Sequence, residues 1–171
     1  MSRIKLPRGI RNNNPLNIRR NEKQMWVGEV AQLEHKYGAE IYTERDRFFC
    51  QFQDLIFGWR AAFITLHTYI VKHKCNTIEK IITRWAPPSE NNTTQYINNV
   101  SFFSLIYPDA EIDFYDKIAM IKIAAAMCIV ENGTAYDPIK ADNTLALLDA
   151  GYESALHAVK IKMKDAEGGT K

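Results

Sequence analysis

The chain has few cysteines, and their positions do not predict a metal site. Cys50, Cys75 and Cys128 are far apart and odd in number, unlike the closely spaced pairs that bind zinc. Cys128 lies in an apolar run, where a free cysteine behaves as a small hydrophobic residue. The four histidines also lack metal-ligand spacing, and no glycine-rich loop is present to hold a phosphate. We therefore expect free thiols, synthesis in a reducing compartment, and neither a metal nor another cofactor.

The chain also lacks a long apolar segment and an excess of charge of one sign. Residues 1–14 carry charge but no apolar stretch, so we expect no secretory signal. The longest apolar run is too short to cross a bilayer and is interrupted by Lys122. The 22 Lys and Arg residues against 20 Asp and Glu residues give a net charge of +2, which is too balanced to require nucleic acid. These features predict synthesis in the cytoplasm, no membrane insertion and no nucleic-acid partner.

What the chain does contain is an apolar run over residues 116–132 that ends in a carboxylate. Aliphatic and alanine residues leave this run almost no polar face, and a helix that is apolar all round is a buried helix. Acidic residues are seldom fully buried unless they are paired. Glu131, at the point where this helix emerges, is therefore the most informative position in the chain.

The length and the 46% hydrophobic content predict one globular domain. We expect it to span residues 1–164 and to be followed by a mobile C-terminal tail, residues 165–171. Aromatic and β-branched residues gather between positions 32 and 52, which predicts a small antiparallel hairpin. Leu16-Asn17-Ile18 alternates like a short strand. The fold class expected is mainly α (α+β).

Helical patterns fill the rest of the chain. Apolar residues recur every three or four positions after Asp54 and continue to Asn76, which predicts an amphipathic helix. Shorter helices follow, and the buried run has a helix of its own. Residues 142–164 predict two helices, or one kinked at Gly151. The residues expected to bound these helices are Asp54, Asn76, Pro87-Pro88, Asn92 and, as the cap of the buried run, Asp113.

Two interpretations of Glu131 are open. It is either the last, solvated residue of a core helix or a general acid. A carboxyl at the edge of an apolar core is partly removed from water, which favours its protonated form. Glycoside cleavage needs such a group to deliver a proton to the leaving oxygen. Glu90 is the alternative catalytic carboxylate, and it ranks lower because its polar loop would leave it solvated.

An asparagine-rich segment surrounds Pro15. Asn13, Asn14 and Asn17 could bind the N-acetyl groups of a sugar, or they could simply hold a turn, because asparagine side chains bond to nearby backbone. The turn is the safer interpretation, and both can hold together.

A second segment, around the Pro87-Pro88 bend, combines aromatic and amide side chains. Trp85 and Tyr96 offer flat apolar faces, and Asn91 offers hydrogen-bonding groups, a combination that suits a sugar ring. The other interpretation is a capped helix start in which Trp85 and Tyr96 fill the core.

The segment AAAMCIVENGTAYDP (residues 124–138) resembles the end of the catalytic helix in lysozyme-like lytic transglycosylases. That family usually has Ser after the catalytic Glu, whereas this chain has Asn132. In its glucosaminidase branch, an Asn motif, a Trp loop, a hairpin and an aromatic helix entry follow the Glu. Similar segments occur here at the start of the chain, in residues 13–18, 26–28 and 49–54. The resemblance implies a lysozyme-like helical domain whose order is circularly permuted, which is tolerable because domain termini commonly lie close together.

Two further motifs resemble a family of phage and prophage virion-associated proteins. They are RGIRNNNPLNIR (residues 8–19) and RWAPPSENNTTQYI (residues 84–97). The common pattern has Gly where this chain has Leu16. The resemblance implies a protein that is virion-associated or delivered to the cell wall by another system, with other virion or secretion-apparatus proteins as further partners.

These resemblances imply a peptidoglycan-cleaving glycosidase or lytic transglycosylase that acts on the MurNAc–GlcNAc bond of glycan strands. Glu131 would act as general acid and base, and a transglycosylase can work with one such group because the substrate's own hydroxyl closes on the anomeric carbon. The alternative is a non-catalytic virion structural or cell-wall-binding module on the same fold. The substrate-binding residues expected are Asn13, Asn14, Asn17, Trp85, Asn91 and Tyr96. This hypothesis requires the end of the late helix to face the start of the chain.

Overall fold

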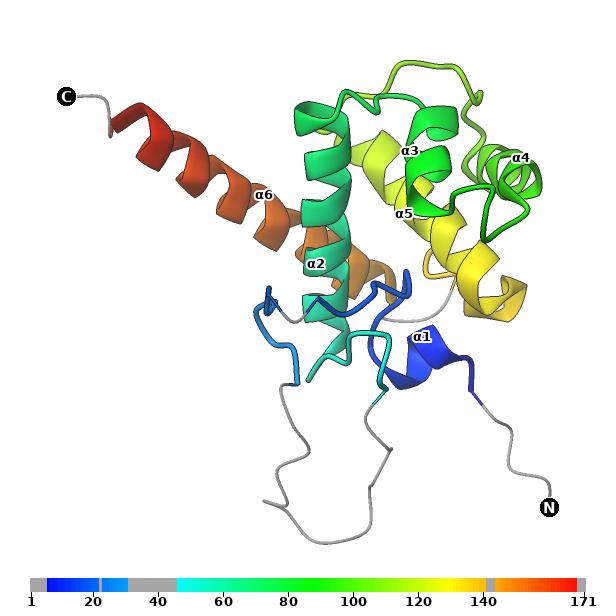
Figure 1. The fold of residues 1–171 in the computed structure, drawn as a ribbon, viewed down its shortest axis with the longest axis horizontal. Helices are drawn as coiled ribbons and strands as arrows, with labels where there is room; N and C mark the ends of the chain where they lie inside the picture. The colour runs from blue at the N-terminus through cyan, green and yellow to red at the C-terminus, as the bar shows by residue number, and fades with distance from the viewer. Residues whose placement is uncertain (1–5, 22, 31–45, 141–143, 169–171) are drawn as a thin grey trace, which may run out of the picture.

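A computed structural model describes residues 6–21, 23–30, 46–140 and 144–168, and within them the chain is mainly helical, as predicted (Figure 1). A π turn (Thr68–Lys72) continues α2, and a 3-10 turn (Thr134–Tyr136) follows α5. No helix in the described ranges is long and apolar enough to cross a membrane. The α-helices are α1 (Arg8–Arg11), α2 (Leu55–His67), α3 (Ile78–Trp85), α4 (Thr93–Ser104), α5 (Lys117–Asn132) and α6 (Thr144–Gly168).

The core helix is α5, as its apolar sequence predicts. All of its residues from Ile123 to Ile129 are buried, and α4 packs along it. Removing these side chains from water is the main favourable contribution to folding. The first turn differs, because Ile118 is 70% exposed there. The buried part of the helix therefore lies toward the end that carries Glu131.

The second packing unit is α2 against α6. Phe63 of α2 meets Tyr152 of α6 edge to face, with ring centroids 5.2 Å apart. A Cβ at Gly151 would clash with Trp59, so glycine permits the close approach of the two helices. The sequence of residues 142–164 predicts two helices, or one kinked at Gly151. The described residues of this interval form one helix, α6. Figure 1 shows α6 running past α2 and away from the other helices.

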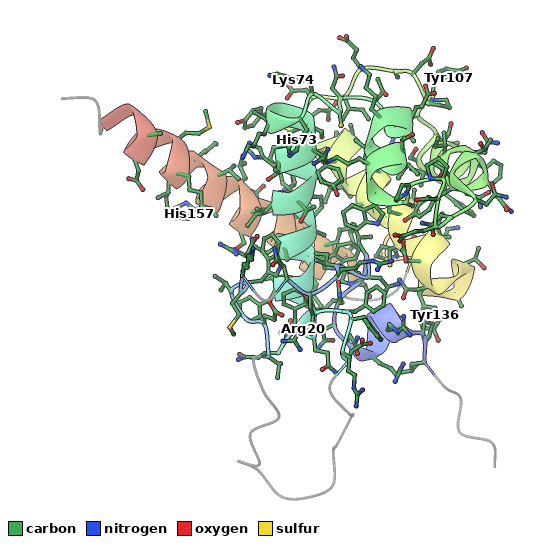
Figure 2. All side chains as sticks on the ribbon, in the orientation of Figure 1. Arg20, His73, Lys74, Tyr107, Tyr136 and His157 are labelled. Atoms are coloured by element: carbon green, nitrogen blue, oxygen red, sulfur yellow. The ribbon has the colours of Figure 1, made fainter. Side chains whose placement is uncertain are left out.

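The helix continues beyond the predicted domain limit of residue 164. Residues 165–168, expected as the start of a mobile tail, belong to α6, and residues 169–171 lie outside the described residues. Figure 2 shows His157 on the outer side of this helix, away from α2.

Side-chain caps begin the helices largely where the sequence predicts. Asp54 accepts a hydrogen bond from the Ile56 amide at the start of α2, and Asn92 accepts one from Gln95 at the start of α4. The prediction for α5 was wrong by one turn. Asp116 accepts from the Ala119 amide at 3.1 Å, whereas Asp113 bonds within the preceding turn. Both aspartates are suited to capping, so residue type alone did not distinguish them.

The β prediction concerns a region that is only partly described. Residues 31–45, where most of the expected hairpin falls, lie outside the described residues. In the described part, Phe49 and Phe52 form isolated antiparallel bridges with Arg19 and Glu29. The short strand predicted at residues 16–18 is wrong, because Asn17 has the left-handed φ of +50°. Asparagine adopts this conformation more readily than most residues, and its turn preference outweighs the alternating pattern.

Candidate active site

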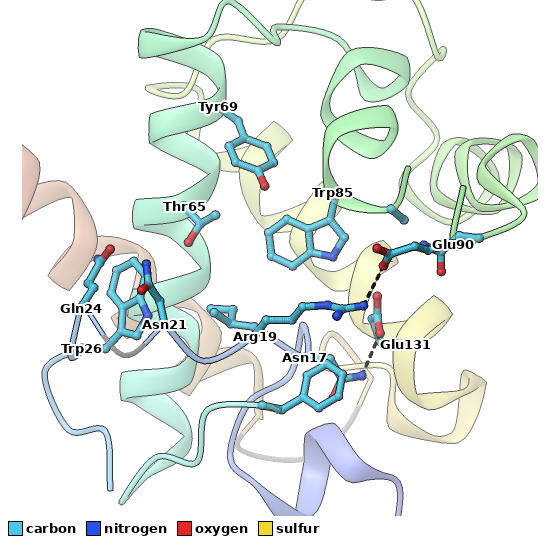
Figure 3. A pocket seen from close by; sticks show the side chains of 14 residues that line it. Asn17, Arg19, Asn21, Gln24, Trp26, Thr65, Tyr69, Trp85, Glu90 and Glu131 are labelled. Carbon is cyan, nitrogen blue, oxygen red and sulfur yellow. Dashed lines mark hydrogen bonds and ion pairs between the residues drawn. The ribbon is translucent and has the colours of Figure 1, made fainter. Parts of the chain in front are cut away.

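The carboxyl group of Glu131 lies in the last turn of α5 and is hydrogen-bonded on both oxygens. The Asn17 side-chain amide donates to Oε2 at 2.8 Å (Figure 3). The Tyr96 hydroxyl donates to Oε1 at 2.8 Å. Glu131 is only partly exposed. Each carboxylate oxygen has a second lone pair, so the group can also receive or release a proton on its open side.

Asn17 reaches Glu131 because the asparagine-rich segment forms a rigid turn. The Asn14 side chain is fully buried; it donates to the carbonyls of Ile18 and Cys50 and accepts from the Ile18 amide at 2.8 Å. The turn leaves Asn17 with positive φ. The turn directs the Asn17 side chain toward the end of α5, where its amide bonds to Glu131.

The residue after the carboxylate fixes this turn to the helix. Asn132 is buried, and its amide donates to the Pro15 carbonyl at 2.8 Å and to the Cys128 carbonyl at 3.1 Å. The side chain therefore joins the end of α5 to the start of the chain. A Cβ at Gly9 would clash with Asn132 Oδ1, so α1 approaches the same point closely.

Tyr96 approaches Glu131 from the protein interior. Tyr96 is 9% exposed and belongs to the core. Burial, together with the neighbouring Glu131 charge and hydrogen bond, raises the pKa of Tyr96 well above its usual range. The hydroxyl therefore keeps its proton at neutral pH, and it remains a donor to Glu131.

A cavity of about 390 Å³ begins at Glu131 and extends toward α2 (Figure 3). Aromatic side chains form much of its wall, and the Tyr69 and Trp85 rings meet edge to face with centroids 6.0 Å apart. Amide side chains, the Thr65 hydroxyl, the Glu131 carboxyl and one ion pair provide polar groups. Aromatic walls with a few polar groups are typical of a small-molecule site. The lining residues are Asn17, Ile18, Arg19, Asn21, Gln24, Trp26, Phe49, Thr65, Tyr69, Trp85, Ala86, Glu90, Asn91 and Glu131.

An ion pair crosses the cavity close to the carboxyl group. Arg19 Nη2 lies 2.8 Å from Glu90 Oε2, with side chains 70% and 54% exposed. Arg19 comes from the N-terminal segment and Glu90 from the loop between α3 and α4. The guanidinium carbon of Arg19 also lies 5.8 Å from the centroid of the Phe49 ring. Glu90, the alternative catalytic carboxylate, is thus held by a cation.

The structure brings together most of the residues that the sequence indicated. Asn17, Trp85, Glu90, Asn91 and Glu131 line the cavity, and Tyr96 contacts Glu131 from behind.

Asn13 and Asn14 have other contacts. Neither is among the described residues that line the cavity. The Asn13 amide donates to the Phe52 carbonyl at 3.1 Å, and Asn14 bonds within its own turn and to the Cys50 carbonyl. Both residues hold the turn, which is the safer of the two interpretations drawn from the sequence.

The sequence does not single out several cavity residues. Arg19 lies inside the motif at residues 8–19, Phe49 inside the segment 49–54, and Tyr69 inside the apolar helical pattern that follows Asp54. Tyr69 lies in the π turn, and such turns often occur at functional sites. Nothing in local periodicity distinguishes a ring that faces a cavity from one that faces the core.

Two buried thiols lie near the site but do not supply a nucleophile. Burial raises the pKa of Cys128 to about 12 and that of Cys50 to about 12. A cysteine reacts as its thiolate, so both thiols are inert at neutral pH. In the described part of the chain, no group of three His, Cys, Asp or Glu side chains is placed to hold a metal ion. The described lining of the cavity carries carboxyl, amide, hydroxyl and guanidinium groups.

The fold and the site together define a mainly helical protein whose core helix ends in a carboxyl at an aromatic-walled cavity. A scan against models of known protein families finds no match. The chain is 38% identical over 138 residues to Protein P5 of Pseudoalteromonas phage PM2, and the aligned part covers 78% of each chain. With that identity and coverage, the chain belongs to the family of this phage protein. The phage relationship expected from the motifs in residues 8–19 and 84–97 is confirmed at this level.

Proposed function

We propose that this protein is a phage-associated enzyme that cleaves the MurNAc–GlcNAc bond of peptidoglycan, with Glu131 as general acid and base. The observation that carries the proposal is the carboxyl group at the end of the core helix, open to the cavity and held by Asn17 and Tyr96. A buried helix gives this group a fixed position, and catalytic groups need such fixed geometry.

The reaction needs two proton transfers at Glu131. The protonated carboxyl first gives its proton to the glycosidic oxygen, and the bond from that oxygen to the anomeric carbon breaks. Asn17 and Tyr96 stabilise the carboxylate that this step leaves behind. The carboxylate then takes a proton from the hydroxyl that bonds to the anomeric carbon. That hydroxyl belongs to the sugar itself in a lytic transglycosylase and to water in a hydrolase.

The cavity walls suit a glycan. Trp85, Trp26 and Tyr69 offer faces on which the C–H side of a sugar can stack, and Asn91 and Asn17 offer amides for hydroxyl and N-acetyl groups. The volume of about 390 Å³ lies within the range of small-molecule sites. Part of a glycan strand would occupy the cavity, with the scissile bond beside Glu131.

We infer that the lysozyme-like order is circularly permuted. In the order that the sequence resembles, the Asn turn follows the catalytic helix directly along the chain. Here the Asn17 amide contacts Glu131 from 114 positions earlier. An experimentally determined structure that superposes on a lysozyme-like domain only after the segments are reordered is the expected result. Superposition in chain order, or none, would contradict it.

The first prediction concerns Glu131→Gln. This substitution keeps the shape and one acceptor oxygen but removes the titratable proton, so we expect lysis of purified sacculi to fall by a factor of about 10² or more. Loss of turbidity and release of muropeptides measure the rate.

Two matched substitutions complete that experiment. Glu111→Gln alters an exposed carboxyl outside the described cavity lining and should leave lysis unchanged. Glu90→Gln tests the alternative catalyst and should retain most activity. Full lysis by Glu131→Gln would eliminate Glu131 as catalyst, and loss confined to Glu90→Gln would transfer the role to Glu90.

A second function is favoured by one observation. Both oxygens of Glu131 are already bonded to protein groups, an arrangement that equally suits a structural carboxyl. The protein would then be a non-catalytic virion component that binds cell-wall glycan in the same cavity. Retention on insoluble peptidoglycan, without release of muropeptides by the unaltered protein, would select this function.

A further inference from the structure

The Arg19–Glu90 ion pair provides a further inference, which rests on the proposed glycan-binding function of the cavity. We propose that Arg19 binds a carboxylate of the peptidoglycan strand, and that Glu90 occupies Arg19 only until this carboxylate replaces it. Arg19 thereby selects anionic cell-wall glycan over neutral glycan of the same backbone.

The charges of the cavity point to this role. Among the described lining residues, Arg19 carries the one positive charge, against the two carboxyl groups of Glu90 and Glu131. Figure 3 shows Arg19 extending across the cavity to Glu90, with Glu131 at the same end. An anionic ligand that enters this cavity therefore meets one cation, and it meets that cation near the proposed cleavage site.

The existing pair is easily exchanged. Both side chains are more than half exposed, and exposed ion pairs contribute little to stability. The contact to Glu90 uses a single terminal nitrogen, Nη2, whereas a guanidinium carries five N–H donors in a planar fork that binds carboxylates through two parallel bonds. A substrate carboxylate can thus offer a better contact than Glu90 does.

Arg19 is kept near the cavity without Glu90. Its guanidinium lies by the Phe49 ring, and the backbone of Arg19 forms an antiparallel bridge with Phe49. Breaking the ion pair therefore leaves the cation beside the cavity, held near Phe49, where a substrate carboxylate can reach it.

The test measures binding by full-length Glu131→Gln protein to three forms of purified glycan. One form keeps its stem peptides, one is stripped of them by an amidase and carries free lactyl carboxylates, and one has all carboxylates converted to amides with carbodiimide and ammonia. We expect the carboxylate-bearing glycan to bind about tenfold more tightly than the amidated glycan, which is the effect of one good charged contact. Adding Arg19→Ala should remove that difference, and Arg19→Lys should restore part of it.

Two further substitutions distinguish exchange from simple attraction. Glu90→Gln removes the competitor and should tighten binding of carboxylate-bearing glycan by roughly two- to fivefold, the strength of an exposed pair. Arg11→Ala alters another exposed arginine, outside the described cavity lining, and should change nothing. A preference that persists with stripped glycan assigns the bound group to the lactyl carboxylate, and one that is confined to intact stems assigns it to the peptide.

Equal loss of affinity for all three glycans in Arg19→Ala, or no loss at all, would overturn the proposal. Weaker binding of carboxylate-bearing glycan by Glu90→Gln would show that Glu90 positions Arg19 and would overturn the exchange. Failure of the proposed function is read separately, because it appears as absence of cleavage by the unaltered protein. The charge preference in binding does not depend on cleavage.

Discussion

At the scale of single residues, neighbouring side chains at the end of α5 have different tasks. Glu131 faces the cavity, whereas Asn132 is buried and holds the Pro15 carbonyl. The resemblance to lytic transglycosylases leads one to expect Ser after the catalytic Glu. The structure explains the asparagine found there, because its longer amide reaches the N-terminal turn. Asn132 therefore joins two segments of the fold and is not oriented for substrate contact.

Tyr96→Phe tests the buried donor to Glu131. The ring stays and the hydroxyl is lost, so Oε1 of Glu131 loses its partner on the buried side. We expect the free energy of unfolding to fall by about 1–2 kcal/mol and lysis of sacculi to fall roughly tenfold. Urea denaturation and the turbidity assay measure the two effects. Tyr107→Phe, at a tyrosine that is 80% exposed, is the matched control, and equal behaviour of the two variants would contradict this role.

At the scale of elements, helix ends were the most predictable features. The caps Asp54 and Asn92 and the stop before Pro87 depend on chemistry within a few residues, which a sequence displays directly. The π turn at Thr68–Lys72 has no such signal, so α2 was expected to run on to Asn76. The length of α5 and the burial of its second half followed from composition, because no polar face was available to meet water.

The beginning of α5 offers a direct comparison of two aspartates. Asp116→Ala removes the side chain that accepts the Ala119 amide and should lower the free energy of unfolding by about 1 kcal/mol. Asp116→Asn keeps the cap and should cost much less. Asp113→Ala should also cost less, because Asp113 accepts only from Tyr115 in a turn. Chemical denaturation measures the free energy of unfolding of the three variants. A larger loss for Asp113→Ala than for Asp116→Ala would identify Asp113 as the cap, as the sequence predicts.

The candidate site was only partly predictable, for a related reason. Glu131 was found from a local contrast between an apolar run and its terminal carboxylate. The order of the resembling motifs predicts that the end of α5 faces the start of the chain, but the hydrogen bond to Asn17 in particular is a finding of the structure. Arg19 and Tyr69 were missed because their role depends on contacts between segments far apart in the chain. Most of the predicted hairpin falls in residues 31–45, which lie outside the described residues, so the hairpin stays a prediction.

At the scale of the whole molecule, His67 of α2 packs against the loop that precedes α5, and this loop also contacts α6. Its ring lies edge to face with Phe114 at 4.8 Å, and its Nε2 is buried without a hydrogen-bond partner in the described structure. The adjacent Tyr115 hydroxyl lies 3.6 Å from the sulfur of Met163 in α6. Protonation of His67 would therefore place an unpaired charge where α2, the loop before α5 and α6 meet.

This arrangement makes stability depend on pH in one direction. Burial lowers the pKa of His67 below its ordinary value of 6.5, so below that pH the unfolded chain binds a proton that the folded chain resists. The contribution of His67 to stability is complete above 6.5 and is lost as the pH falls through 6.5 toward the folded pKa. We expect His67→Gln to show a smaller fall in Tm between about pH 7.5 and 5.5 than the unaltered protein. His157→Gln, at the outer face of α6, should show the full fall, and a full fall in His67→Gln as well would contradict the prediction.

The contact between Asn17 and Glu131 also has a consequence for the order of events during synthesis. The two residues are 114 positions apart, and the Asn132–Pro15 contact spans 117. A chain leaves the ribosome from its N-terminal side, so the asparagine turn emerges long before the carboxyl that it holds. No nascent chain that ends before residue 131 can contain the proposed acid. The site can therefore assemble only after residue 132 has emerged from the ribosome, when the turn and the helix can contact each other.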